Sequence, residues 1–119
     1  MSERESVDRL LPLPAATFHI LLSLAEGERH GYALKREIAQ RTERKLVLGP
    51  GVLYGAIARM IEQGLIEESD DRPDPHLDDE RRRYYRMTVF GRRVAQAEAA
   101  RLRELAALAA ERFGRRERA

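Results

Sequence analysis

The sequence contains no cysteine and no tryptophan. Without cysteine there is no disulfide framework, no thiol catalysis and no cysteine-ligated zinc, as is common in a reducing cytoplasm. No apolar run approaches the roughly 20 residues that a membrane-spanning helix needs, and no charged leader followed by an apolar core opens the chain. We therefore expect a cytoplasmic protein without a membrane partner. The missing tryptophan also removes a side chain that could stack on a ligand, so the residues identify no effector.

Motifs of enzymes are absent as well. The histidines are scattered, at His19, His30 and His76. No phosphate-binding loop with a lysine, no nucleophile elbow and no paired-carboxylate motif is present. The acidic stretch PDPHLDDE lacks the glycine and the ligand spacing of a calcium-binding EF-hand. We expect a protein that is not an enzyme and that holds neither a cofactor nor a metal.

Charge is unevenly distributed along the 119 residues, a length that suits one domain with a modest core. The net charge is only +2. Residues 30–64 nevertheless have more basic than acidic side chains, whereas residues 69–83 hold a cluster of acids. A polyanion would be attracted to one part of this surface more than to another.

Helical spacing of apolar residues predicts three helices in the first half of the chain. The first runs from Pro14, suited to a first helical position, to about Glu26. The second opens at His30-Gly31. Its inner face is expected to hold Tyr32, Ala33, Leu34 and Ile38, and its outer face the charged Lys35, Arg36, Glu37 and Arg41. The third spans Pro50 to Gln63, with Gly64 as its C-terminal stop and one apolar face, formed by Leu53, Ile57, Met60 and Ile61.

Two short extended segments follow the third helix. They cover Leu65 to Glu68 and Arg82 to Met87, and the loop SDDRPDPHLDDE separates them. Its prolines and aspartates resist regular structure, so the two segments are predicted to form a β-hairpin with a long acidic tip.

A final helix is predicted from Thr88, whose hydroxyl suits an N-cap, to about Phe113. Its apolar stripe covers about half of the helix, wider than a helix lying on its own small domain usually needs. We interpret it as a dimerisation helix, although it could instead pack back on its own domain. Arg101 falls in the stripe, where it must reach solvent or pair with an acid across the interface. The predicted dimer residues are Phe90, Val94, Arg101, Leu102, Leu105, Leu108 and Phe113.

The order of three helices, a hairpin and a long helix is that of a winged helix-turn-helix domain with an appended dimerisation helix. The predicted fold class is thus mainly α with a small β-hairpin. We divide the chain into an N-terminal arm (1–13), a DNA-binding domain (14–88) and a dimerisation helix with its tail (89–119). Pattern alone does not prove this, because other small helical domains could show similar helices and a hairpin.

Three stretches of sequence resemble the PadR family of bacterial transcriptional regulators. They are HGYALKREI (30–38), GPGVLYGAIARMIEQGLIEE (49–68) and RRRYYRMTVFGRR (81–93). The resemblance implies a dimeric winged-helix repressor that silences a nearby operon or its own gene and is released by a small molecule or stress signal. The single C-terminal helix is similar to the small subgroup of that family. Val52 and Gly55 depart from the pattern, since relatives often place a hydroxyl residue and a proline there.

The third helix would then be the recognition helix. Its outward positions are predicted at Val52, Gly55, Ala56, Arg59 and Gln63. The residues expected to touch DNA are Lys45, Gly51, Val52, Tyr54, Arg59, Gln63, Arg82 and Arg83. Free N–H groups at the helix start can hold a phosphate, and glycines would let that phosphate approach the backbone.

Each of these assignments has an alternative. Turn geometry alone could explain the glycines at the start of the third helix, and Arg59 could be a solvated helix position. Tyr54 could be a core residue, and the arginines of the hairpin could be a solvated charge run. The acidic tip is predicted to point away from DNA or to pair with those arginines.

The sequence thus predicts a homodimeric repressor that binds an inverted-repeat operator in double-stranded DNA, with half-sites about 10 base pairs apart or a multiple of that spacing. A small-molecule effector is implied by the resemblance only. The alternative is a winged-helix module that binds other proteins and does not read DNA, which the acidic loop and the few polar side chains of the third helix would also suit.

Overall fold

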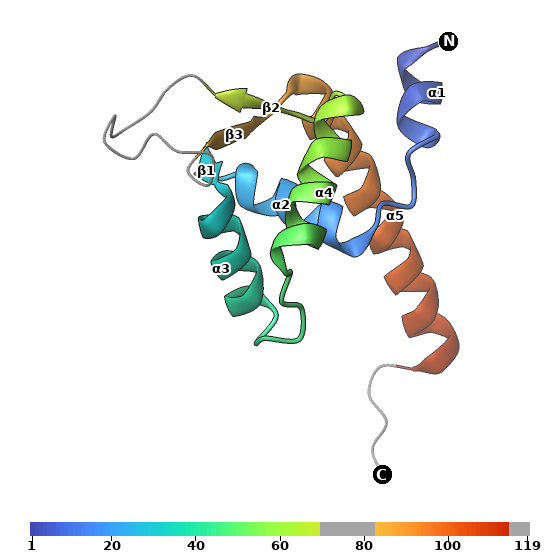
Figure 1. Ribbon diagram of the computed structural model, residues 1–119. Coiled ribbons are helices and arrows are strands. Elements are labelled where there is room, and N and C mark those ends of the chain that lie inside the picture. The colour runs from blue at the N-terminus through green and yellow to red at the C-terminus, as the bar shows by residue number, and fades with distance from the viewer. Residues whose placement is uncertain (70–82, 115–119) are drawn as a thin grey trace.

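The computed structural model describes residues 1–69 and 83–114 (Figure 1). Its elements are α1 (Glu3–Asp8), α2 (Ala15–Leu24), β1 (Arg29–His30), α3 (Gly31–Arg41), α4 (Pro50–Glu62), β2 (Ile66–Ser69), β3 (Tyr84–Met87) and α5 (Val89–Phe113). This arrangement confirms the predicted fold class, mainly α with a small antiparallel sheet. None of the helices in these two segments is long and apolar enough to cross a membrane.

The core lies where α2, α3 and α4 meet the sheet and the first turns of α5. The side chains with almost no exposed surface include Ile20, Leu21, Leu34, Ile38, Leu53, Met60, Leu65, Ile66 and Val94. The predicted helix boundaries hold to within about two residues because local signals set them. The His30 ring accepts the Ala33 N–H at 3.1 Å and caps α3, and Gly64 ends α4 with a φ of 78°.

The sheet has the strand order β1-β3-β2. The predicted hairpin is confirmed by antiparallel pairing of β2 with β3, from Ile66 opposite Met87 to Ser69 opposite Tyr84. Strand β1 was not predicted, and it pairs with the other edge of β3 through Arg29 and His30. Two residues are too few to leave an alternating pattern in a sequence. Because β1 leads directly into α3, the sheet is joined to the helix that precedes α4.

The N-terminal arm holds a helix that was not predicted. In α1, Ser2 and Glu5 form a capping box, with each side chain accepting the other residue's backbone N–H at 3.1 and 2.9 Å. The helix lies beside α5, where Glu3 forms an ion pair with Arg93, and Val7 is buried in the core. The arm is therefore packed on the rest of the chain.

Helix α5 divides into two parts. Up to Arg101 it packs on its own domain, and beyond that point every residue to Phe113 is exposed. In Figure 1 the C-terminal end of α5 runs away from the other elements. The prediction that Val94 contacts a partner is wrong, because Val94 is entirely buried in the protein's own core, and Phe90 is half-buried against that core. The exposed apolar side chains of the second part are Leu102, Leu105, Leu108 and Phe113.

Arg101 forms an ion pair within its own helix. It donates to the Glu98 carboxylate at 2.7 and 3.0 Å, and this carboxylate also accepts the Leu13 N–H at 3.1 Å. The hydrogen bond from Arg101 lowers the pKa of Glu98, against the opposing effect of burial. The negative charge of this buried side chain thereby ties the segment before α2 to α5.

Candidate nucleic-acid interface

One face of α4 is open to solvent. Val52, Gly55, Arg59 and Gln63 are exposed there as predicted, and Val52 retains 61% of its surface. The outward position predicted for Ala56 is wrong. Ala56 is only 2% exposed, because 100° per residue places it in the same sector as Leu53 and Met60, which face the core.

The glycines at the start of α4 are not required by the fold. None of Gly49, Gly51 and Gly55 has a positive φ, so turn geometry does not explain them. A Cβ atom built on any of the three would meet nothing within 4 Å. Glycine within a helix costs about 0.5–1 kcal/mol relative to alanine. The glycines of α4 therefore lower the stability of the helix slightly, and they leave its backbone uncovered by side chains on the exposed face.

The first turn of α4 offers backbone donors on that surface. Gly49 is the N-cap and supplies no side-chain hydrogen bond, and Pro50 follows it at the first helical position. The N–H groups of a first helical turn have no carbonyl partner within the helix, and the helix dipole adds partial positive charge there. The backbone N–H groups of Gly51 and Val52 are therefore available to donate hydrogen bonds to an anion such as phosphate.

Tyr54 lies at the contact between α4 and α3. It is half-buried, and its hydroxyl and ring lie so close to Gly31 that a Cβ there would approach the hydroxyl oxygen to 2.5 Å. This contact explains why glycine follows histidine at the start of α3. The packing role of Tyr54 is evident, and its phosphate contact stays a prediction.

The connector between α3 and α4 is a compact turn that carries Lys45. The Thr42 hydroxyl donates to the Ile38 carbonyl at 2.8 Å and accepts the Leu46 N–H at 3.1 Å. Glu43 and Arg44 have positive φ angles of 54° and 65°, an uncommon conformation for residues other than glycine. Lys45 is exposed on this turn, five residues before α4 begins.

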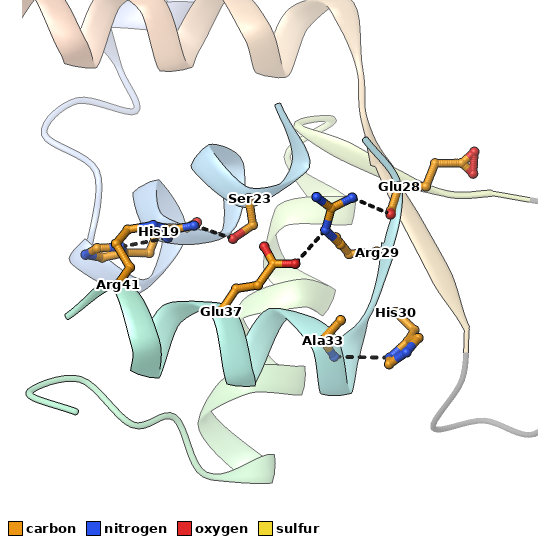
Figure 2. A network of polar contacts seen from close by, with 8 residues as sticks. All are labelled: His19, Ser23, Glu28, Arg29, His30, Ala33, Glu37 and Arg41. Atoms are coloured by element: carbon orange, nitrogen blue, oxygen red, sulfur yellow. Dashed lines mark hydrogen bonds and ion pairs between the residues drawn. The ribbon is translucent and has the colours of Figure 1, made fainter. Parts of the chain in front are cut away.

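Polar contacts fix α3 against its neighbours (Figure 2). Arg41 at its C-terminus donates to Ser23 on α2 at 2.7 Å and lies 3.1 Å from the His19 ring. Burial, and then the charge of Arg41, lower the pKa of His19, which favours the neutral form of its ring beside the guanidinium. Nearer the middle of the helix, Glu37 pairs with Arg29 of β1 at 2.6 Å. Helix α3 is therefore held to both α2 and β1.

The arginines of the hairpin are partly neutralised. Arg83 pairs with Glu68 at 3.1 Å, and Arg86 pairs with Glu67 at 2.8 Å, all on exposed side chains. Arg82 and the acidic loop lie outside the described residues. The predicted direction of the hairpin tip concerns those residues and stays a prediction. Exposed pairs of this kind contribute little to stability, so a phosphate can exchange with the carboxylate at small cost.

Sequence reasoning assigned one exposed aromatic residue to the wrong face. Tyr32 was expected on the inner face of α3, yet it is 57% exposed, with the Arg36 guanidinium carbon 5.3 Å from its ring centre. The spacing of four residues, which brings side chains together on a helix, was the signal available for this pair. Residues 1–69 and 83–114 contain no group of three or more His, Asp or Glu side chains that could hold a metal ion.

Comparison with known families identifies the architecture. The model of the transcriptional regulator PadR-like family matches residues 20–97, which run from α2 into α5. The chain belongs to the PadR-like family of transcriptional regulators. Membership assigns this PadR-like protein to transcriptional regulation rather than to an enzyme class, and together with the winged fold it indicates a DNA-binding regulator.

Solved structures share the fold of this PadR-like chain. A transcriptional regulator from Clostridium thermocellum is 27% identical, with a TM-score of 0.67 over 84% of this chain and 90% of that one. RosR from H. salinarum is 26% identical, with a TM-score of 0.59 over 82% and 78%. A PadR family transcription regulator from Clostridium difficile, 22% identical, has a TM-score of 0.69 over 85% and 100%.

A curated relative is longer. An uncharacterized 37.1 kDa protein in transposon TN4556 of Streptomyces fradiae is 35% identical over 80 residues. Those residues are 67% of this chain, which spans about a fifth (21%) of the relative's length.

Proposed function

We propose that this PadR-like protein is a homodimeric repressor that binds an inverted-repeat operator in double-stranded DNA through the exposed face of α4. The observation that carries the proposal is the bare start of that helix. Neither backbone geometry nor packing requires glycine at these positions. The glycines face solvent beside N–H groups that have no carbonyl partner within the helix. A surface of this kind suits close approach by a phosphate backbone, where side chains would be in the way.

Each side chain of the interface has a separate role in the proposal. Arg59 and Gln63 are long enough to reach base edges in the major groove, and Val52 can touch a thymine methyl. Gly51 admits a phosphate to the backbone. The predicted phosphate contacts outside this face are Lys45, Tyr54, Arg82 and Arg83. With so few polar side chains on α4, the shape of the DNA would supply part of the specificity.

The second part of α5 supports the dimer. Its apolar side chains are left exposed by the described residues, and an open groove of about 660 Å³ runs between α1 and α5. The apolar lining of the groove consists of Val7, Leu11, Ala97 and Ala100. In the proposed dimer each copy lays its exposed leucines on the partner, which buries apolar surface in both. The two-fold axis presents two α4 helices to half-sites about one helical turn, ~10 base pairs, apart or a multiple of that.

Release by a small molecule completes the proposed cycle. A groove of about 150 Å³ lies between α2 and α5, with an apolar lining that includes Phe18, Leu22, Met87 and Ala95, and with Arg92 and Gln96 among its polar residues. Its volume is below the roughly 300 Å³ that typical ligand pockets reach, so it suits a small effector. An effector lodged against α5 would change how the two copies are held, and with that the spacing of the α4 helices.

The test is a DNA-binding measurement on the whole chain. DNA fragments captured from the genome by the protein give the operator, and a scrambled duplex of the same length gives the reference. Arg59→Ala should weaken binding to the operator by ~1 to 3 kcal/mol, and binding to the scrambled duplex much less, if Arg59 pairs with a base. Unchanged affinity for both duplexes would remove Arg59 from the interface.

Salt dependence separates DNA binding from the alternative of a protein-binding module. Release of counterions from DNA makes affinity fall steeply as salt rises. A folded protein that binds neither duplex, even at low salt, would contradict the proposed function and favour the module.

The dimer has its own prediction. Leu105→Asp places a charge among the exposed leucines of α5 and should convert the dimer to monomers in analytical ultracentrifugation, because an unpaired carboxylate is costly to bury. Val47→Asp, on a similarly exposed apolar residue of the α3–α4 connector, is the matched control and should remain dimeric. A Leu105→Asp protein that sediments as a dimer would show that the copies meet elsewhere.

A further inference from the structure

A row of stacked side chains runs along the surface from the sheet onto α3. The His30 ring packs edge-on against Tyr84 of β3, with ring centres 5.4 Å apart, and stacks on Tyr32 at 6.5 Å. The Arg36 guanidinium then lies over the Tyr32 ring at 5.3 Å. We call Tyr84, His30, Tyr32 and Arg36 the aromatic row. It crosses three elements, β3, β1 and α3.

Two members of the row, Tyr32 and Arg36, have no evident role in stabilising the fold. Tyr32 keeps 57% of its surface, so its ring contributes little to the core. No carboxylate in the described part of the chain pairs with Arg36, which is exposed, whereas Arg29, Arg83 and Arg86 each have an acidic partner. A tyrosine hydroxyl and an uncompensated guanidinium are thus held together at the surface.

The row lies beside a contact between α3 and α4. Gly31, the neighbour of Tyr32, lies directly against Tyr54 of α4. On α4 the side chain of Tyr54 marks the edge between the buried sector and the sector that carries Gly51 and Gly55, taking 100° per residue. A duplex that follows the open face of α4 past Tyr54 would next meet Tyr32 and Arg36.

We propose that Tyr32 and Arg36 bind the phosphate backbone of the same duplex that α4 contacts. The inference rests on the proposed function and extends the interface onto α3. The Tyr32 hydroxyl would donate to one phosphate oxygen, and the guanidinium, held over the ring, would keep its N–H groups for the phosphate.

His30 is a positioning residue in this arrangement. Its ring accepts the Ala33 N–H at 3.1 Å, which fixes it at the N-terminus of α3. In this position its ring faces both Tyr32 and Tyr84, so α3 and the hairpin keep one relative placement. The row would therefore set the distance between the phosphates bound at α3 and those bound at the hairpin of β2 and β3.

Arg36→Gln and Tyr32→Phe test the proposal on the captured operator and on the scrambled duplex. A phosphate contact carries no sequence information, so both duplexes should lose affinity equally, by about tenfold for Arg36→Gln and about threefold for Tyr32→Phe. The slope of log affinity against log salt should become shallower by about 0.9 for Arg36→Gln, the value for one phosphate. Arg103→Gln, an identical charge change on the exposed part of α5, is the matched control and should leave affinity and slope unchanged.

Several results would overturn the inference. An Arg36→Gln protein with wild-type affinity and slope, alongside an Arg59→Ala protein that binds the operator weakly, would exclude the α3 contact and leave the proposed function in place. A loss confined to the operator would mean that Arg36 reads bases, which contradicts a phosphate contact. Wild-type protein that binds neither duplex would overturn both proposals. Equal thermal melting of all variants verifies that the fold is intact.

Discussion

Replacing Gly91 with alanine should lower the free energy of unfolding by about 3 kcal/mol or more. A Cβ at this position would lie 2.0 Å from the Leu65 carbonyl oxygen and 3.1 Å from Met87 Cγ. The obstacle is backbone rather than a flexible side chain. That carbonyl accepts the Thr88 N–H at 3.0 Å, and the Thr88 hydroxyl donates to the neighbouring Gly64 carbonyl at 2.6 Å, so moving this backbone disrupts the junction between α4, β3 and α5.

Chemical denaturation of the two proteins measures this effect. Gly55→Ala is the matched control, because it adds the same methyl group to a helical glycine that has open space around it. The control should be at least as stable as the wild-type chain. A Gly91→Ala protein that unfolds at the wild-type denaturant concentration would show that α5 can shift away from Leu65.

The sequence predicted those parts of the fold that local chemistry decides. The Thr88 hydroxyl accepts the Gly91 N–H at 2.9 Å, as an N-cap does, and α5 ends at Phe113 as expected. Helical periodicity likewise located α2, α3 and α4, because each buries one face on a common core. The order of these elements then specified the winged arrangement.

The parts that could not be predicted depend on partners distant in the sequence. Burial in the protein's own core and burial against a second copy require the same apolar residues. A stripe on α5 therefore does not reveal that Val94 is internal and Leu105 exposed. Strand β1 exists only because β3 pairs with it. Helix α1 did leave a local signal, the Ser2 and Glu5 of its capping box, within an arm that otherwise reads as polar.

For the candidate interface, the sequence predicted correctly which residues lie at the centre of the exposed face of α4, and it was less successful for residues near the edge of a face. Val52, Arg59 and Gln63 are on the surface as expected, because helical spacing gives the face of a residue directly. The assignments failed near the edges of a face. Ala56 is buried and Tyr32 exposed, since small side chains and amphipathic rings suit either environment. The aromatic row could not be predicted from the sequence, because it depends on the strand pairing that brings Tyr84 beside His30.

Gly51→Ala separates the requirements of the fold from those of the proposed function, because it should change them in opposite directions. Gly51 has an ordinary helical conformation and open space at its Cβ, so alanine should raise the free energy of unfolding by about 0.4 to 1 kcal/mol by restricting the unfolded chain. The same methyl group would stand between a phosphate and the first-turn N–H groups of α4. We expect affinity for the operator and for the scrambled duplex to fall by about tenfold, as when a charged hydrogen bond is lost.

Thermal melting and DNA binding, measured on one preparation, decide the matter. Ala58→Gly, on the same exposed face, is the reverse control, and it should melt lower because glycine is about 0.8–1 kcal/mol less favourable than alanine in a helix. Its DNA affinity should remain within a factor of two or so, because removing a methyl group obstructs nothing. A more stable Gly51→Ala protein with undiminished affinity would mean that no phosphate approaches the start of α4. The bare helix face would then need a different explanation, since a substitution that stabilises the fold without harming DNA binding leaves glycine at this position with no advantage.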